Sequence, residues 1–169
     1  MGHMSVAFEG LLGLDYHQIL LNSQLYDDVI YDEAFEGSSN ELVGASAPGS
    51  LCLMTGSATG YLRVRVVVSD REPELGTWED IIEVPFEPKT STLSLMSLFP
   101  DVTYPSPLVH TMVRFELAGG SYRARWSIRG FQAAWDLVSD GPTPDEYQLD
   151  LWPAPPVSES VRRRSGTIG

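Results

Sequence analysis

Carboxylates dominate the first third of this 169-residue chain, and their chemistry suits the recognition of positive charge. Residues 1–62 hold eight carboxylates and no lysine or arginine, whereas all eleven basic residues follow from Arg63 onward. Charge of a single sign repels nucleic acid and attracts basic surfaces. We therefore predict a surface for a basic protein partner, with a role in solubility alone as the alternative. Six carboxylates are its candidate residues: Asp27, Asp28, Asp32, Glu33, Glu36 and Glu41.

Arginines that alternate with apolar side chains form a second charged group. Residues 61–68 and 121–129 each show a period of two, which is typical of a β-strand with one buried face. The arginines would then share the outward face, where they either pair with this chain's own carboxylates or bind an anion. Five arginines are the candidates for an anion site: Arg63, Arg65, Arg114, Arg123 and Arg125.

A tight turn at Gly119 and Gly120 predicts a hairpin between residues 109–117 and 121–129. Counting from this turn places Arg114 opposite Arg125. Like charges at directly opposed positions are unfavourable, so a carboxylate or a bound anion would have to compensate.

The candidate nucleophiles, bases and metal ligands in the sequence give little support for catalysis. Cys52 lies in an apolar run, which is typical of a core thiol, and nothing places His17 or His110 beside it. The histidines and the cysteine have no metal-ligand spacing, and the acidic cluster lacks the pattern of an EF-hand loop. We therefore predict no enzyme activity, no cofactor and no metal, although a carboxylate-based hydrolase stays open among 23 acidic residues.

Composition indicates one folded domain in a reducing compartment. The formal net charge is −12, and residues 1–156 alone, with 8 bases and 22 acids, carry −14. One cysteine excludes an internal disulfide, and neither a signal peptide nor a membrane span is readable, so we expect a cytoplasmic protein without membrane or nucleic-acid contacts. Residues 1–4 are expected to be an expression remnant before a native start at Met4.

Many short alternating segments between glycine- and proline-rich turns predict an all-β, antiparallel β-sandwich over residues 5–156. One short helix is expected within residues 130–139. Residues 157–169 contain three adjacent arginines after a proline-rich stretch and are expected to form a disordered basic tail. The other expected strands are residues 12–21, 29–34, 50–55, 78–87, 92–98 and 147–152.

The order of several short motifs resembles the competence protein J family. These motifs are Leu-Asp-Tyr-His-Gln-Ile at 14–19, Glu-Val-Pro-Phe at 83–86, Leu-Ala-Gly-Gly-Ser-Tyr-Arg at 117–123 and Tyr-Gln-Leu-Asp-Leu-Trp-Pro at 147–153. The resemblance spans roughly residues 12–155. The chain departs from the family pattern in the 99–107 connection, the 131–146 insertion and the basic tail.

The resemblance implies an inhibitor of a DNA-entry nuclease. An acidic protein can present carboxylates to a positive nuclease cleft in place of phosphates, with association that weakens as salt rises. The leading hypothesis is therefore an inhibitor or immunity-type protein that blocks a basic nuclease or toxin. The alternative is a small-molecule or anion-binding sandwich that uses the arginine face. A homodimer through an edge strand stays open.

Overall fold

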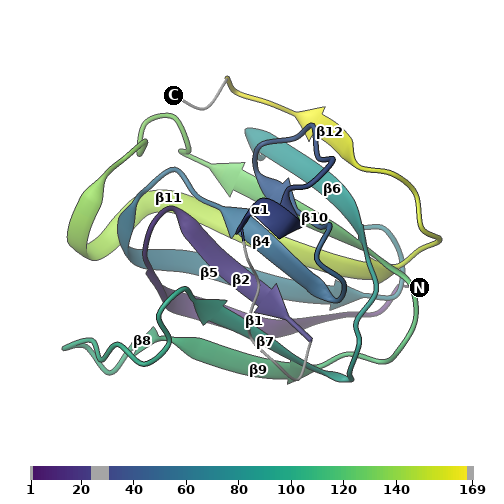
Figure 1. The fold of residues 1–169 in the computed structure, drawn as a ribbon, viewed down its shortest axis with the longest axis horizontal. Coiled ribbons are helices and arrows are strands. Elements are labelled where there is room, and N and C mark those ends of the chain that lie inside the picture. Colours follow the sequence, from purple (N-terminus) through teal and green to yellow (C-terminus); the bar gives the residue numbers. More distant parts are fainter. Residues whose placement is uncertain (1, 24–30, 167–169) are drawn as a thin grey trace.

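Two β-sheets packed face to face make up the molecule (Figure 1). The structure is a computed structural model that describes residues 2–23 and 31–166. In spatial order, the larger sheet contains β12 (Ser160–Arg163), β6 (Asp80–Phe86), β10 (Tyr122–Arg129), β11 (Val138–Pro153), β5 (Thr59–Ser69), β1 (Met4–Leu14) and β8 (Val109–His110). The smaller sheet contains β3 (Val43–Gly44), β4 (Ser50–Met54), β2 (Gln18–Asn22), β7 (Thr92–Ser97) and β9 (Met112–Glu116). The predicted all-β sandwich is confirmed.

The core lies between the two sheets and follows from the alternation in the sequence. On β5, Leu62, Val64 and Val66 are buried against the smaller sheet, while the intervening arginines point outward. Adjacent strands are antiparallel except for the parallel pairs β1–β8 and β5–β11. Trp126, on β10, is fully buried in this core, as its place in the pattern predicts.

The expected strand at residues 12–21 is two strands in different sheets. β1 ends at Leu14, and the chain passes to β2 through a turn in which Tyr16 and His17 both have a left-handed backbone, with φ angles of 51° and 61°. This conformation is uncommon for residues other than glycine, so the turn is a sharply constrained link between the two sheets.

The predicted hairpin at Gly119 and Gly120 is wrong. β9 pairs with β7 in the smaller sheet, while β10 pairs with β6 and β11 in the larger one. The two glycines are therefore part of a crossover between sheets, and Arg114 lies opposite Ser94 instead of Arg125. A glycine pair gives the same local signal for either connection, since both require a sharp turn.

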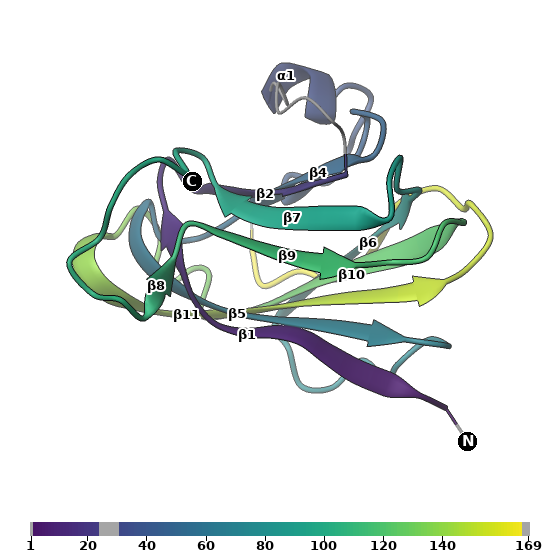
Figure 2. The same cartoon turned by 90° about the horizontal axis from the view of Figure 1, so that it is seen from below.

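The short helix is not where the sequence indicated. Residues 131–136 form turns that end at Asp136, whose φ of 60° interrupts any helix, and β11 begins two residues later. Helix α1 (Tyr31–Ala34) instead occupies part of the predicted strand at 29–34, of which residues 29–30 lie outside the described residues. Figure 2 shows α1 on the outer side of the smaller sheet, where Ala34 packs with Leu20 and Cys52.

The prediction of a disordered tail from residue 157 is wrong for Ser160–Arg163. These residues form β12 and pair with the edge strand β6. The arginines that suggested a solvated tail find acceptors: Arg164 lies 3.0 Å from the buried Asp80 carboxylate, and Arg163 donates to the Gly76 carbonyl oxygen. The segment, which we call the C-terminal strap (residues 157–166), is held by pairing with β6 and by hydrogen bonds that its side chains and backbone donate to Gly76 and Asp80.

Candidate functional site

The outer face of the larger sheet divides into a covered half and an open half. The covered half lies over β6 and β10, where residues 72–78 pack on the outer face and the C-terminal strap runs along the edge of the sheet beside β6. Arg125 is only 1% exposed there. Its Nε donates to Glu83 Oε2 at 2.8 Å, a second guanidinium nitrogen donates to the Pro73 carbonyl oxygen, and the guanidinium lies 4.8 Å from the Trp152 ring centroid.

Arg123 is similarly engaged in the covered half. It donates to the carbonyl oxygens of Val157 and Ser158 in the strap and lies 3.6 Å from Glu83. Asp150, across the sheet from Arg125, is buried among these charges. Burial raises the pKa of Asp150, while a hydrogen bond from Gln148 and the nearby arginines oppose that rise. The covered half is therefore an internal charge network rather than a ligand site.

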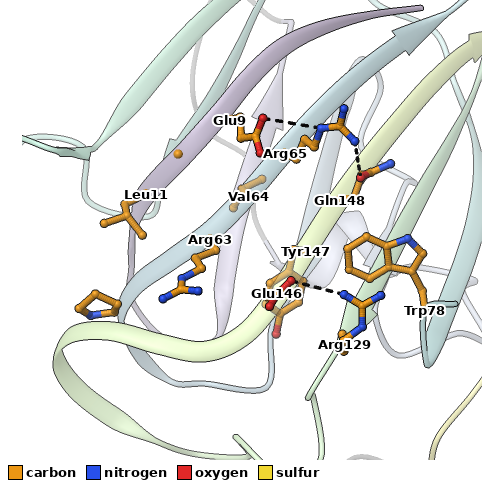
Figure 3. A pocket seen from close by; sticks show the side chains of 12 residues that line it. Glu9, Leu11, Arg63, Val64, Arg65, Trp78, Arg129, Glu146, Tyr147 and Gln148 are labelled. Atoms are coloured by element: carbon orange, nitrogen blue, oxygen red, sulfur yellow. Dashed lines mark hydrogen bonds and ion pairs between the residues drawn. The ribbon is translucent and has the colours of Figure 1, made fainter. Parts of the chain in front are cut away.

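The open half lies over β11, β5 and β1 and contains a groove of about 590 Å³ (Figure 3). Strand register places Glu146 between Arg129 and Arg63, and places Arg65 between Gln148 and Glu9. Twelve residues line the groove: Glu9, Gly10, Leu11, Arg63, Val64, Arg65, Trp78, Arg129, Pro142, Glu146, Tyr147 and Gln148.

Two of the three arginines in the groove already have carboxylate partners. Arg129 lies 3.4 Å from Glu146 and stacks over the Trp78 ring at 4.4 Å, and Arg65 lies 3.8 Å from Glu9. Arg63 is exposed and has no hydrogen bond or ion pair within the described part of the chain. The groove thus offers one available guanidinium with an indole nearby, which suits a small anion with an aromatic or apolar portion.

The anion set predicted from sequence is therefore not one site. Arg63 and Arg65 line the groove, whereas Arg123 and Arg125 are buried and paired in the covered half. Arg114 is exposed on β9 of the other sheet. The sequence pattern missed Arg129 and Trp78 as groove residues, although Arg129 belongs to the same alternating run.

The predicted acidic surface is only partly described. Asp27 and Asp28 lie outside the described residues, and Asp32 lies in α1. Glu33, Glu36 and Glu41 are exposed around α1 and the turn that follows it. Their role in partner binding stays a prediction.

One carboxylate of the strap is tied to the same region. Glu159 accepts hydrogen bonds from Ser38, Ser39 and Asn40, including the backbone amide of Ser39 at 2.7 Å. Partial burial acts to raise the pKa of Glu159, but these hydrogen bonds outweigh it and lower the pKa from 4.5 to about 2. Glu159 therefore fastens the strap to the loop between α1 and β3.

Exposed apolar side chains gather at the end of the sandwich formed by residues 15–17, 99–108 and 136–140, which we call the loop end. Tyr16 contacts Phe99 edge-on with ring centroids 5.9 Å apart. On the other side of the same turn, His17 Nε2 lies 3.0 Å from Asp136 Oδ1, and the His17 ring stacks on Trp135 at 4.6 Å. Charge and alternation in the sequence did not point to this cluster, although apolar residues in proline-rich loops are a readable signal.

The side chains considered for catalysis do not contact one another. Cys52 is fully buried with its Sγ 3.4 Å from Gln18 Oε1, and burial raises the pKa of this thiol from 9.0 to about 12. His17 bonds to the Thr55 carbonyl oxygen and Asp136, while His110 packs against Phe8. Cys52 is therefore a core residue without an activating base.

The described residues contain neither a metal-binding cluster nor a membrane-spanning helix. Residues 2–23 and 31–166 contain no group of three or more histidine, cysteine, aspartate or glutamate side chains that could hold a metal ion. Over the same residues, no helix has the length and hydropathy needed to cross a membrane.

Comparison with solved structures identifies two proteins of the same architecture. The crystal structure of ComJ from Bacillus subtilis, an inhibitor of the DNA-degrading activity of NucA, matches with a TM-score of 0.59 at 16% identity. The protein described as crocagin biosynthetic gene J matches with a TM-score of 0.53 at 17% identity. Each match covers 90% of this chain and 99% of the other.

These matches concern the fold. No protein-family model and no curated protein matches the chain. The resemblance to the competence protein J family, drawn from short sequence motifs, is confirmed at the level of three-dimensional structure. Because each match covers nearly the whole of both chains at low sequence identity, what is shared is the sandwich architecture.

Proposed function

We propose that this protein is a non-catalytic inhibitor or immunity-type protein that binds a basic protein, either a nuclease or a toxin. The observation that carries the proposal is the structural likeness to an inhibitor of a nuclease over nearly the whole of both chains. A fold alone does not define a function, so the residues must support the same conclusion.

Two features of the residues support binding over catalysis. The chain has a formal net charge of −12, and such a field speeds the approach of a basic partner and weakens as salt rises. The described side chains that could act as nucleophile and base are apart, and each of them has a structural contact.

A DNA-degradation assay tests the proposal. Purified protein is titrated into plasmid DNA with NucA, and in parallel with the nuclease activity of the source organism's own extract. We expect at least one of the two activities to fall with a stoichiometric endpoint, and to recover as salt is raised. If the protein leaves both activities unchanged at large molar excess, the proposal is wrong.

The groove supports a second candidate function, the binding of a small anion. The specific observation is the exposed and unpaired Arg63 inside a groove that also contains Trp78. Phosphate, sulfate and nucleotides should then raise the midpoint of thermal unfolding, because a ligand that binds only the folded state stabilises it. The variant R63A should lose this stabilisation, whereas R114A, an exposed arginine outside the groove, should retain it. An equal response of both variants would exclude the groove.

A further inference from the structure

Among the residues that the structure describes, apolar exposure is concentrated at the loop end. Six of the ten large hydrophobic side chains that are exposed among the described residues lie there or directly beside it, in three segments that are distant in sequence. Tyr16 is 68% exposed and Val138 is 71% exposed. Concentrated apolar exposure marks interaction surfaces more often than scattered single residues do. The six residues are Tyr16, Phe99, Val102, Leu108, Leu137 and Val138.

The loop end is built to hold these side chains in place. Tyr16, His17 and Asp136 are the residues other than glycine that have positive φ angles in the described chain, and all three lie in two facing turns. Each such conformation costs on the order of 1 kcal/mol and persists only where the surroundings enforce it. The enforcing contacts are the hydrogen bonds of His17 to Thr55 and Asp136.

The 99–108 loop is fixed against the same turn. The Tyr104 ring packs on Gly13, where an added Cβ would lie 2.4 Å from the ring, and meets Tyr61 edge-on at 5.4 Å. Tyr104 also hydrogen-bonds to Asp15; burial raises the pKa of Asp15, and this hydrogen bond opposes the rise. A preorganised surface loses little conformational entropy on binding, which favours affinity.

The charge around this apolar cluster has one sign. The segments 15–17, 99–108 and 136–140 contain four aspartates and no lysine or arginine. Asp101, Asp136 and Asp140 are exposed beside the apolar side chains. An apolar centre within an acidic rim matches a partner that presents an apolar patch surrounded by lysine and arginine.

We propose that the loop end is the surface that docks onto the basic nuclease or toxin. This inference rests on the proposed function and identifies the part of the chain that performs it. Tyr16 and Phe99 act as rigid aromatic anchors, since tyrosine is enriched among the residues that dominate binding energy. Asp101 and Asp140 steer the encounter and pair with the partner's basic rim.

The other charged surfaces fit this role less well. Near the described part of the acidic surface, one exposed large hydrophobic residue, Val161 of the strap, lines a pocket together with Glu41, against six such residues at the loop end. The groove contains three arginines against two glutamates and would repel a basic partner. Charge alone mainly changes the association rate, whereas a stable complex also needs buried apolar anchors.

The test compares inhibition constants for the nuclease that the unmodified protein inhibits, either NucA or the enzyme of the source organism. The double variant Y16A/F99A should raise the inhibition constant by ~30-fold or more. V138D should weaken inhibition strongly, while the matched control V157D, an exposed valine in the strap, should not. The triple variant E33Q/E36Q/E41Q tests the rival surface. Thermal unfolding of each variant verifies that it folds.

The outcomes separate the two proposals. If the unmodified protein inhibits neither nuclease, the proposed function fails first. If it inhibits and only E33Q/E36Q/E41Q loses affinity, the protein is an inhibitor but the loop end is not its docking surface. If sedimentation shows a dimer that V138D dissociates while inhibition is unchanged, the loop end binds a second copy of this chain. Either of the last two results overturns the inference.

Discussion

The covered and open halves of the larger sheet's outer face show how one sequence pattern yields two kinds of surface. Arg123 and Arg125 alternate with apolar residues on β10 just as Arg63 and Arg65 do on β5. On β10 the arginines are buried beneath residues 72–78 and the strap, and are paired with Glu83. On β5 they line an open groove.

The difference comes from segments that are far away in sequence. Alternation specifies which side of a strand faces the core, and it carries no information about what crosses the opposite face. Residues 72–78, which cover Arg125, begin about 50 residues before it, and the strap residue Ser158, which pairs with Arg123, lies 35 residues after Arg123. Arg123 and Arg125 of β10 are therefore structural, whereas Arg63 of β5 is available for binding.

The largest expected effect is in the covered half. R125A leaves Glu83 buried without its closest partner, so we expect a loss of about 3–5 kcal/mol in the free energy of unfolding. The matched variant R63A, in the open half, should change stability by no more than about 0.5 kcal/mol. Urea denaturation of both variants measures the contrast. Similar losses for the two variants would contradict the division of the face.

Removal of the strap should also destabilise the sheet, by about 2–3 kcal/mol. A chain that ends at Pro156 lacks β12, exposes the edge of β6 and removes the acceptors of Arg123. Thermal and urea unfolding of the shortened chain provide the measurement. Unchanged stability would mean that the strap rests on the sheet without holding it, and that residues 72–78 alone provide the cover.

Strong acid should loosen the strap by protonating Glu159. The pKa of Glu159 is lowered in the folded state to about 2 from 4.5, so its stabilising contribution is complete above pH 4.5 and is lost as the pH falls toward 2. E159Q should therefore be less stable than the unmodified protein at neutral pH, and the difference should shrink over this interval. Unfolding measured at several pH values tests it; a difference independent of pH would exclude the Glu159 carboxylate as the cause.

The smallest effect should come from the ion pair between Arg65 and Glu9 in the open half. Both side chains are substantially exposed and lie 3.8 Å apart, so a double-mutant cycle should give a coupling of about 0.2–1 kcal/mol. The same cycle on Arg125 and Glu83 should give a clearly larger value. Equal coupling energies would show that burial does not distinguish the halves.

Local patterns were sufficient to predict the sandwich and most strands. β5, β6, β7 and β10 fall where alternation placed them, because each has one face in the core. The turn at Tyr16 and His17 was not readable, since neither residue favours a left-handed backbone. The crossover at Gly119 was misassigned because a glycine pair serves a hairpin and a crossover equally well.

The candidate sites were less predictable than the fold. Which arginines are exposed depends on the strap, whose order comes from tertiary acceptors such as Asp80 that a basic, proline-flanked segment does not reveal. The loop end depends on contacts between residues more than 80 positions apart, such as Tyr16 with Phe99. The acidic surface could be predicted from charge alone. Charge alone does not supply the apolar contacts that a stable complex needs.

Hydrogen–deuterium exchange of this protein, alone and with NucA or the source organism's nuclease, tests most directly the proposal that the loop end is the docking surface. We predict that the nuclease slows exchange in peptides covering residues 15–17, 99–108 and 136–140, and leaves the strap and the β5 groove unchanged. Protection confined to the α1 region, the groove or the strap would contradict the claim that the loop end is where this protein binds.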